Sequence, residues 1–280
     1  MTIVARRLQV VDHAPAGARV RRSFKHPRSA AVIEEIVGDG GLPTGASTWP
    51  EPVNDLHVVF VEPDQLGAWE LQHPEWMAKP SCAEAEEAIA IRGARVTVRW
   101  RPGRAIVACD VGQRDLWSVA LADFLFYEGE LRRFERQLET VEVEAEADAS
   151  RAFRIQHKNR EHWRLFGAKI ENLALTRLKF ARLEPRVAKG SRTLPPPARR
   201  LFNHLARKAD VEARLEAFGD RLEVCEELYE GGSDRVGDYH WYRGGHWLEI
   251  GILFFIIIEC VLMLIEVYFS YQAFINPKPD

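Results

Sequence analysis

The feature that most constrains this chain is an almost uninterrupted apolar stretch near its C-terminus, residues 247–271, which reads WLEIGILFFIIIECVLMLIEVYFSY. A helix rises about 1.5 Å per residue, so about 20 residues cross the roughly 30 Å hydrocarbon layer of a bilayer. Aromatic side chains cluster on both sides of the stretch, where rings favour the boundary between headgroups and acyl chains. The sequence therefore predicts one transmembrane helix at 247–271, followed by a short tail at 272–280. The alternative is a buried core helix.

Two acidic residues, Glu259 and Glu266, interrupt the apolar stretch and lie two helical turns apart on one face. An acidic residue at the membrane centre costs about 2.5–3.5 kcal/mol, whereas each Ile, Leu or Phe returns about 0.3–0.6 kcal/mol. Intramembrane acids mark ion paths or partner helices. We therefore name both as candidate intramembrane contacts, with protonated Glu259 bonding across a homo-oligomer as one hypothesis. The alternative is that Glu266 reaches the interface and Glu259 is neutral and tolerated.

Residues 1–112 have the pattern of a small α+β domain. Short runs rich in β-branched residues predict strands at 2–11, 57–63, 95–100 and 104–110. The last two flank Pro102 and Gly103, which predict a hairpin turn. A segment rich in Gly and Pro at 38–52 predicts a linker or a long excursion. Ser81 and Glu84 form a capping-box pattern, which predicts a helix that reaches about Ile91.

The segment 113–232 has apolar residues at alternating steps of three and four, as on one face of a helix. The predicted helices are 116–138, 152–183 and 198–230, with an acidic segment closing the first, Pro185 stopping the second and Gly231-Gly232 ending the third. Three long helices with heptad-like stripes predict an antiparallel bundle or a coiled hairpin. A juxtamembrane joint at 233–246 then leads to the transmembrane helix. The predicted fold class is α+β, with a small N-terminal domain, long helices and one membrane helix.

Charge is segregated along the chain, although the formal net charge is only −3. Residues 151–208 hold 16 Lys and Arg against three Glu, and residues 210–238 hold ten Asp and Glu against three Arg. The interpretation we favour is that these blocks pair with each other. Contact of the basic helix with anionic lipid headgroups comes next, and contact with RNA third. The candidate polyanion or headgroup contacts are Arg160, Arg164, Lys169, Lys179, Arg182 and Arg186.

No sequence motif in the chain indicates catalysis or cofactor binding. There is no HExxH, G-x-S-x-G or P-loop pattern and no G-x-G-x-x-G after a predicted strand. The nine histidines and four cysteines are scattered, without the spacing of a zinc site or a disulfide framework. We therefore predict no catalytic residue, no metal and no cofactor, and we expect a protein that is not an enzyme.

Three segments of the chain resemble a known family. They are ALADFLFYEGELRRFERQLE (120–139), RLEAFGDRLEVCEELYE (214–230) and HWLEIGILFFIIIECVLMLIEV (246–267). They look like parts of the "required for meiotic nuclear division" family, a domain of unknown function found in bacteria, fungi and mitochondria. The resemblance covers a little over half of the chain. It implies long helices before a C-terminal membrane helix, and an inner-membrane protein that in mitochondria is linked to anchoring the translation machinery.

The predicted function is a non-enzymatic, membrane-tethered scaffold or anchor. It self-associates through helices 116–138 and 198–230 and holds a protein partner at the cytoplasmic face of the cell (inner) membrane. The N-terminus lacks the apolar core of a secretory signal, so we expect a single-pass protein with a cytoplasmic N-terminus. The mitochondrial inner membrane is the alternative. Two other functions stay open: docking of RNA or a ribosome through the basic helix 151–183, and a membrane-associated enzyme of unknown reaction.

Overall fold

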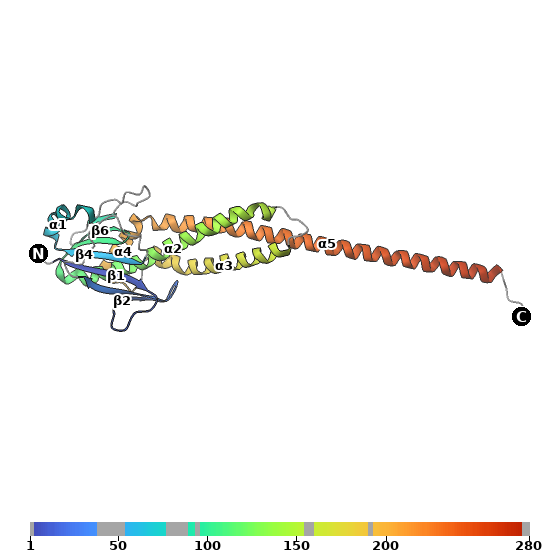
Figure 1. Cartoon of the computed structure of the whole chain (residues 1–280), viewed down its shortest axis with the longest axis horizontal. Helices are drawn as coiled ribbons and strands as arrows, with labels where there is room; N and C mark the ends of the chain where they lie inside the picture. The colour runs from blue at the N-terminus through green and yellow to red at the C-terminus, as the bar shows by residue number, and fades with distance from the viewer. Residues whose placement is uncertain are drawn as a thin grey trace. The chain divides into compact units, whose positions relative to one another are not determined.

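The computed structural model describes residues 3–37, 54–76, 89–92, 96–153, 160–189 and 193–275. The strands are β1 (Val4–Val11), β2 (Arg19–Phe24), β3 (Ala30–Val37), β4 (Asp55–Val61), β5 (Ile89–Arg92), β6 (Val96–Arg101) and β7 (Arg104–Cys109). The α-helices are α1 (Leu66–Gln72), α2 (Arg114–Phe153), α3 (Arg160–Lys189), α4 (Pro196–Lys208) and α5 (Val211–Ile275). A sheet domain is thus followed by long helices, the last of them apolar at its C-terminal end (Figure 1). This arrangement confirms the predicted α+β class.

The chain divides into two compact units, which are described separately below. Unit 1 comprises Met1–Glu144 and Glu171–Glu226, and unit 2 comprises Ala145–Ile170 and Glu227–Asp280. Unit 1 therefore holds the whole sheet, α1, α4 and parts of the other three helices. Unit 2 holds the end of α2, the start of α3 and the remainder of α5.

The sheet of unit 1 is mixed, with the strand order β2-β3-β1-β4-β7-β6-β5. Strands β4 and β7 pair in parallel, and all other neighbouring strands pair antiparallel. The four strands predicted from the sequence are present, and β6 and β7 form the predicted hairpin. The sequence analysis missed β2 and β3. The predicted linker at 38–52 and the capping residues Ser81 and Glu84 lie outside the described residues.

The helix expected to reach Ile91 is wrong at its C-terminal end, where the chain forms strand β5. Ile89 and Ile91 lie opposite Trp100 and Val98 of β6. Alternate residues of β5 therefore lie beside partners that are buried, a periodicity of two that suits a strand rather than a helix. Four residues give too short a pattern for the sequence alone to show it.

The sheet has an apolar layer on each face. On one face, residues of β4 and β7 such as Val59 and Ile106 form a cluster with Trp69 and Trp76. On the other face, the ring of Trp100 meets Phe124 of α2 edge to face at 4.9 Å between centroids, and Phe124 meets Phe202 of α4 at 5.8 Å. The core therefore lies on both sides of the sheet, with α2 and α4 contributing to the second layer.

The helices of unit 1 pack through the predicted apolar stripes. Phe134 of α2 lies 6.4 Å from Phe180 of α3 and 6.0 Å from Phe218 of α5 between ring centroids, and Phe180 and Phe218 are 4.3 Å apart. The ion pairs Glu135–Arg214 and Glu142–Arg221 follow the same order along α2 and α5, so these helices run parallel. Helix α3 runs antiparallel to α2, because the contacts Phe134–Phe180 and Asp148–Lys169 follow opposite order along the two helices.

The buried stripes correct the route proposed for self-association. Helices 116–138 and 198–230 were expected to pair with a second copy through their apolar residues. Leu131, Phe134 and Leu138, and likewise Leu215 and Phe218, are instead buried inside the chain. These buried side chains are therefore not available for contact with a second copy.

The ends of three helices differ from the expectation. Helix α2 continues through the acidic segment 139–150, where Glu142 pairs with Arg221 of α5. Helix α3 continues past Pro185 to Lys189. A proline costs a helix one hydrogen bond, but Leu183 and Val187 on either side of it are fully buried, and this packing favours continuation.

The predicted third helix is two helices. It is divided at Ala209 and Asp210, and Asp210 has a left-handed φ of 47°. Asp tolerates this conformation better than most residues, and its carbonyl accepts the first bond of α5 from Arg214 N at 3.0 Å. Helix α5 then passes through Gly231, Gly232 and the segment 233–246, where the sequence predicted a helix end and a joint.

Unit 2 contains a polar cluster between its helices. Lys169 Nζ donates to Asp148 Oδ2 at 2.6 Å and to the Tyr229 hydroxyl at 3.2 Å, and that hydroxyl also lies 3.3 Å from Asp148 Oδ2. Asp148 is only 4% exposed, and the Phe166 ring lies 5.7 Å from the Tyr229 ring. A buried carboxylate with two donors is satisfied, so this cluster fixes how the three helices are aligned.

Candidate functional site

The apolar part of α5 has the dimensions of a membrane-spanning helix. His246–Val267 comprises 22 residues with a mean hydropathy of 2.7, and none of its most apolar window is buried within the chain. Large apolar side chains such as Phe255 (73% exposed) and Leu264 (70% exposed) would be costly in water. By length, composition and exposure, this segment can cross a bilayer. The predicted contacts Glu259 and Glu266 both lie in it and are both exposed.

The six predicted polyanion contacts all lie on α3, but they differ in whether they contact other residues of the chain. Arg164, Lys179, Arg182 and Arg186 are exposed. Lys169 instead binds Asp148 and Tyr229 within unit 2, and Arg186 forms a hydrogen bond with the buried Tyr127 hydroxyl in unit 1. The side chain of Arg160 lies outside the described part of the chain. Two of the six therefore have contacts within the chain, in line with intramolecular pairing.

The sheet is joined to α2 by a network of arginines and acids. Arg6 Nη1 donates to Glu34 Oε1 at 2.9 Å, to Asp115 Oδ1 at 2.8 Å and to Ser118 Oγ at 3.0 Å. The hydrogen bond from Arg6 holds the pKa of Asp115 below its ordinary value. Arg22 of β2 likewise pairs with the buried Asp123 of α2. These contacts attach β1 and β2 to the start of α2, so the arginines and acids of this network hold the fold together.

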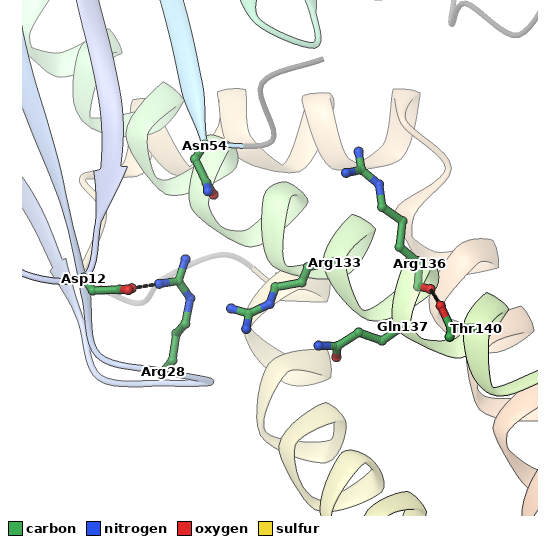
Figure 2. Close-up of a pocket in the computed structure, with 7 residues that line it drawn as sticks. All are labelled: Asp12, Arg28, Asn54, Arg133, Arg136, Gln137 and Thr140. Carbon is green, nitrogen blue, oxygen red and sulfur yellow. Dashed lines mark hydrogen bonds and ion pairs between the residues drawn. The ribbon is translucent and has the colours of Figure 1, made fainter. Parts of the chain in front are cut away.

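A polar pocket of about 520 Å³ lies where the ends of the strands meet the middle of α2. It is lined by Asp12, Arg28, Asn54, Arg133, Arg136, Gln137 and Thr140, which we call the arginine pocket. Asp12 follows β1, Arg28 precedes β3 and Asn54 precedes β4, whereas the other four belong to α2. Figure 2 shows Arg133 and Gln137 extending toward the Asp12–Arg28 pair, while Arg136 extends in a different direction. The topology thus gathers residues that are distant in the sequence.

The electrostatics of the arginine pocket are positive. Arg28 is neutralised by two acids: it pairs with Asp12, and its Nε donates to Glu130 Oε1 at 2.8 Å. Arg133 makes no hydrogen bond or ion pair with any other described residue, so its guanidinium charge is not neutralised within that part of the chain. Guanidinium groups beside amide and hydroxyl groups suit a carboxylate or a phosphate, which they bind in bidentate fashion.

The sequence analysis placed no site at the arginine pocket. It could put Arg133 and Arg136 on the polar face of a helix, where charged residues are ordinary. Arg28 lies between two strands that the sequence analysis missed, and Asn54 lies just before the predicted start of another strand. The sequence therefore gives no indication that either residue lies close to α2. Within the described residues, no three His, Cys, Asp or Glu side chains are grouped so as to hold a metal ion.

Comparison with known proteins establishes no family for this chain. No family model matches it, and no curated protein matches it in sequence. Among solved structures, it is similar to the CorA magnesium transporter from Methanocaldococcus jannaschii, with a TM-score of 0.41 and 10% sequence identity. That match covers 96% of this chain and 87% of that chain. A likeness of this size establishes no shared function, and no property of the transporter is carried over to this chain.

Proposed function

We propose that this protein is a membrane-tethered scaffold, which holds an anionic protein partner at the membrane face through the arginine pocket. The observation that carries the proposal is the exposed, 22-residue apolar segment His246–Val267, which continues a helix of the folded domain. Such a segment is stable in contact with lipid or another apolar surface. A folded domain attached to one apolar helix is suited to holding a partner at a bilayer.

The chemistry of the partner follows from the arginine pocket. Arg133, which has no partner among the described residues, offers a guanidinium group beside Asn54, Gln137 and Thr140, and Arg136 also lines the pocket. An acidic segment of a protein provides carboxylates at several positions, which matches an open pocket lined from four parts of the chain. This supports a protein partner with an acidic segment, and no reaction forms part of the proposal.

Docking of RNA or a ribosome through α3 is the second candidate. The exposed cations Arg164, Lys179 and Arg182 favour it, because phosphate contacts need accessible charge. The internal contacts of Lys169 and Arg186 weaken it, because these cations already have partners in the chain. The resemblance to the "required for meiotic nuclear division" family points in the same direction as this candidate.

The proposed orientation is a single span of the cell (inner) membrane, with the N-terminus cytoplasmic. Arg235 and Arg243 precede the apolar segment, and cationic residues favour the cytoplasmic side. The mitochondrial inner membrane remains the alternative. We assign self-association to the apolar segment, with Glu259 as the proposed contact, because the stripes of the folded helices are buried.

The test separates membranes from soluble material and washes them with carbonate, for the full chain and for a truncation that ends at Gly232. We expect the full chain to resist extraction and the truncation to be soluble, because the truncation lacks the apolar segment. Extraction of both chains by carbonate would contradict the anchor. In that case the exposed segment is covered by protein rather than by lipid.

The same membranes can identify the docking surface. Proteins that co-purify with the full chain after mild detergent are compared for Arg133→Glu/Arg136→Glu and for the control Arg164→Glu/Arg182→Glu. The proposal predicts loss of the partner in the first pair only. Loss in the second pair, together with loss after nuclease treatment, would favour RNA docking instead.

A further inference from the structure

A second cavity, of about 610 Å³, lies in unit 1 beside β5, the strand at the end of the sheet. It is formed by β5, by the start of β6, by the first turn of α2 and by one face of α4. Its size falls in the range of small-molecule sites, roughly 300–1,000 Å³. None of the residues that form it belongs to the arginine pocket.

The inner wall of this cavity is apolar. Leu116, Trp117 and Leu201 line it together with Ile91 of β5. Trp117 is only 6% exposed, yet its indole Nε1 has no hydrogen-bond partner among the described residues, and neither has the buried Oε1 of Gln113.

The outer part of the cavity is cationic. Arg92 lies on β5, and Arg200, His204 and Lys208 follow one another at four-residue steps along α4. This spacing puts the three α4 side chains on one helix face, with the cations Arg200 and Lys208 two helical turns apart. In the described part of the chain, none of the four makes a hydrogen bond or ion pair, and no acidic residue lines the cavity. Arg6, Arg7 and Arg22 of the same sheet domain all have acidic partners.

We propose that this cavity binds a small anionic amphiphile, with its apolar tail against Trp117 and Leu201 and its phosphate or carboxylate head at Arg92, Arg200 and Lys208. An inorganic anion would leave the apolar wall uncovered, and a neutral apolar molecule would leave the cations unpaired. A ligand with both parts satisfies both surfaces. This site is separate from the scaffold function and does not depend on it.

The test uses the full chain in nanodiscs of phosphatidylcholine, titrated by calorimetry with water-soluble probes and with empty nanodiscs as the blank. The probes are octyl phosphate, octanoate, octanol and inorganic phosphate. We expect one amphiphile per chain, with a Kd at least tenfold lower for octyl phosphate or octanoate than for octanol and for inorganic phosphate. Whichever of the two anionic probes binds more tightly assigns the head as a phosphate or a carboxylate.

A matched pair of variants locates the binding site. Lys208 and Arg207 are adjacent in the last turn of α4 and both are exposed, but only Lys208 lines the cavity. Lys208→Gln and Arg200→Gln are each expected to raise the Kd of the better probe at least fivefold, whereas Arg207→Gln changes it less than twofold. Equal effects of Lys208→Gln and Arg207→Gln, equal binding of octanol, or no saturable binding would each overturn the proposal. Since all three positions are exposed, unchanged unfolding temperatures are expected.

Discussion

At the residue scale, Arg214 and Arg221 of α5 both form ion pairs with α2, but water reaches these pairs to different extents. Arg214 Nη2 lies 2.7 Å from Glu135, and its Nη1 lies 3.0 Å from Glu128, whose side chain is only 3% exposed. The two carboxylates raise the pKa of Arg214 above its ordinary value, despite burial. Arg221 and Glu142 are 40% and 32% exposed in their side chains. In the Arg214–Glu128 pair the carboxylate has lost nearly all of its contact with water, whereas both members of the Arg221–Glu142 pair keep much of theirs.

This difference predicts different effects of two similar substitutions. Arg214→Ala should lower the free energy of unfolding by about 3 kcal/mol, because it leaves the buried Glu128 with Arg132 as its remaining donor. Arg221→Ala should lower it by less than about 1 kcal/mol, because water replaces the lost partner. Denaturant unfolding of the full chain in detergent, followed by tryptophan fluorescence, measures both. Similar losses for the two variants would contradict the assigned burial.

At the element scale, the sequence predicted those strands and helices whose apolar pattern is continuous. It missed β2 because Arg19, Arg21 and Arg22 give that segment the composition of a loop. Their partners Glu34, Asp115 and Asp123 come from β3 and α2, so only the tertiary arrangement explains why an arginine-rich strand is stable there. Because β2 was missed, the position of Arg28 beside α2 could not be predicted, and neither could the arginine pocket.

Helix ends were predicted less well than helix interiors for a related reason. Pro185 and Gly231-Gly232 are local signals that favour ending a helix. In α3, burial of Leu183 and Val187 on either side of Pro185 outweighs the lost hydrogen bond. The membrane segment is the opposite case. Its composition alone predicts it, without knowledge of the rest of the fold. The segment is exposed in the structure, as expected for a membrane helix.

The apolar segment of α5 also carries the prediction for self-association. If Glu259 bonds to a second copy within the membrane, Glu259→Leu should leave insertion intact but weaken association by about 1 kcal/mol, a roughly fivefold change. Glu259→Gln keeps a hydrogen-bonding group and should preserve the oligomer. Glu266→Leu, on the same face but near the interface, is the control. Light scattering in detergent measures the populations, and an unchanged oligomer in Glu259→Leu would exclude this contact.

At the scale of the whole molecule, the folded core and the apolar segment are stabilised by different surroundings. In the described part of the chain, the last hydrophobic residue of the buried core is Tyr229, whereas the window within His246–Val267 has no buried share. The core is thus completed by contacts that end before the apolar segment begins. The segment is stabilised instead by whatever surrounds it, which for this composition is lipid.

This separation predicts that the folded part does not need the anchor. A truncation that ends at Gly232 retains Phe218 and the Asp148–Lys169–Tyr229 cluster, so its unfolding temperature should lie within about 3 °C of that of the full chain, a shift of at most about 1 kcal/mol. A second truncation, ending at Asp210, removes α5 and exposes Phe134 and Phe180, so it should lose the cooperative transition. Thermal unfolding followed by circular dichroism compares the three chains. If the Gly232 truncation also lost its cooperative unfolding transition, the folded part would depend on the removed segment. That result would indicate that the apolar segment packs against protein, and it would contradict the proposed membrane anchor.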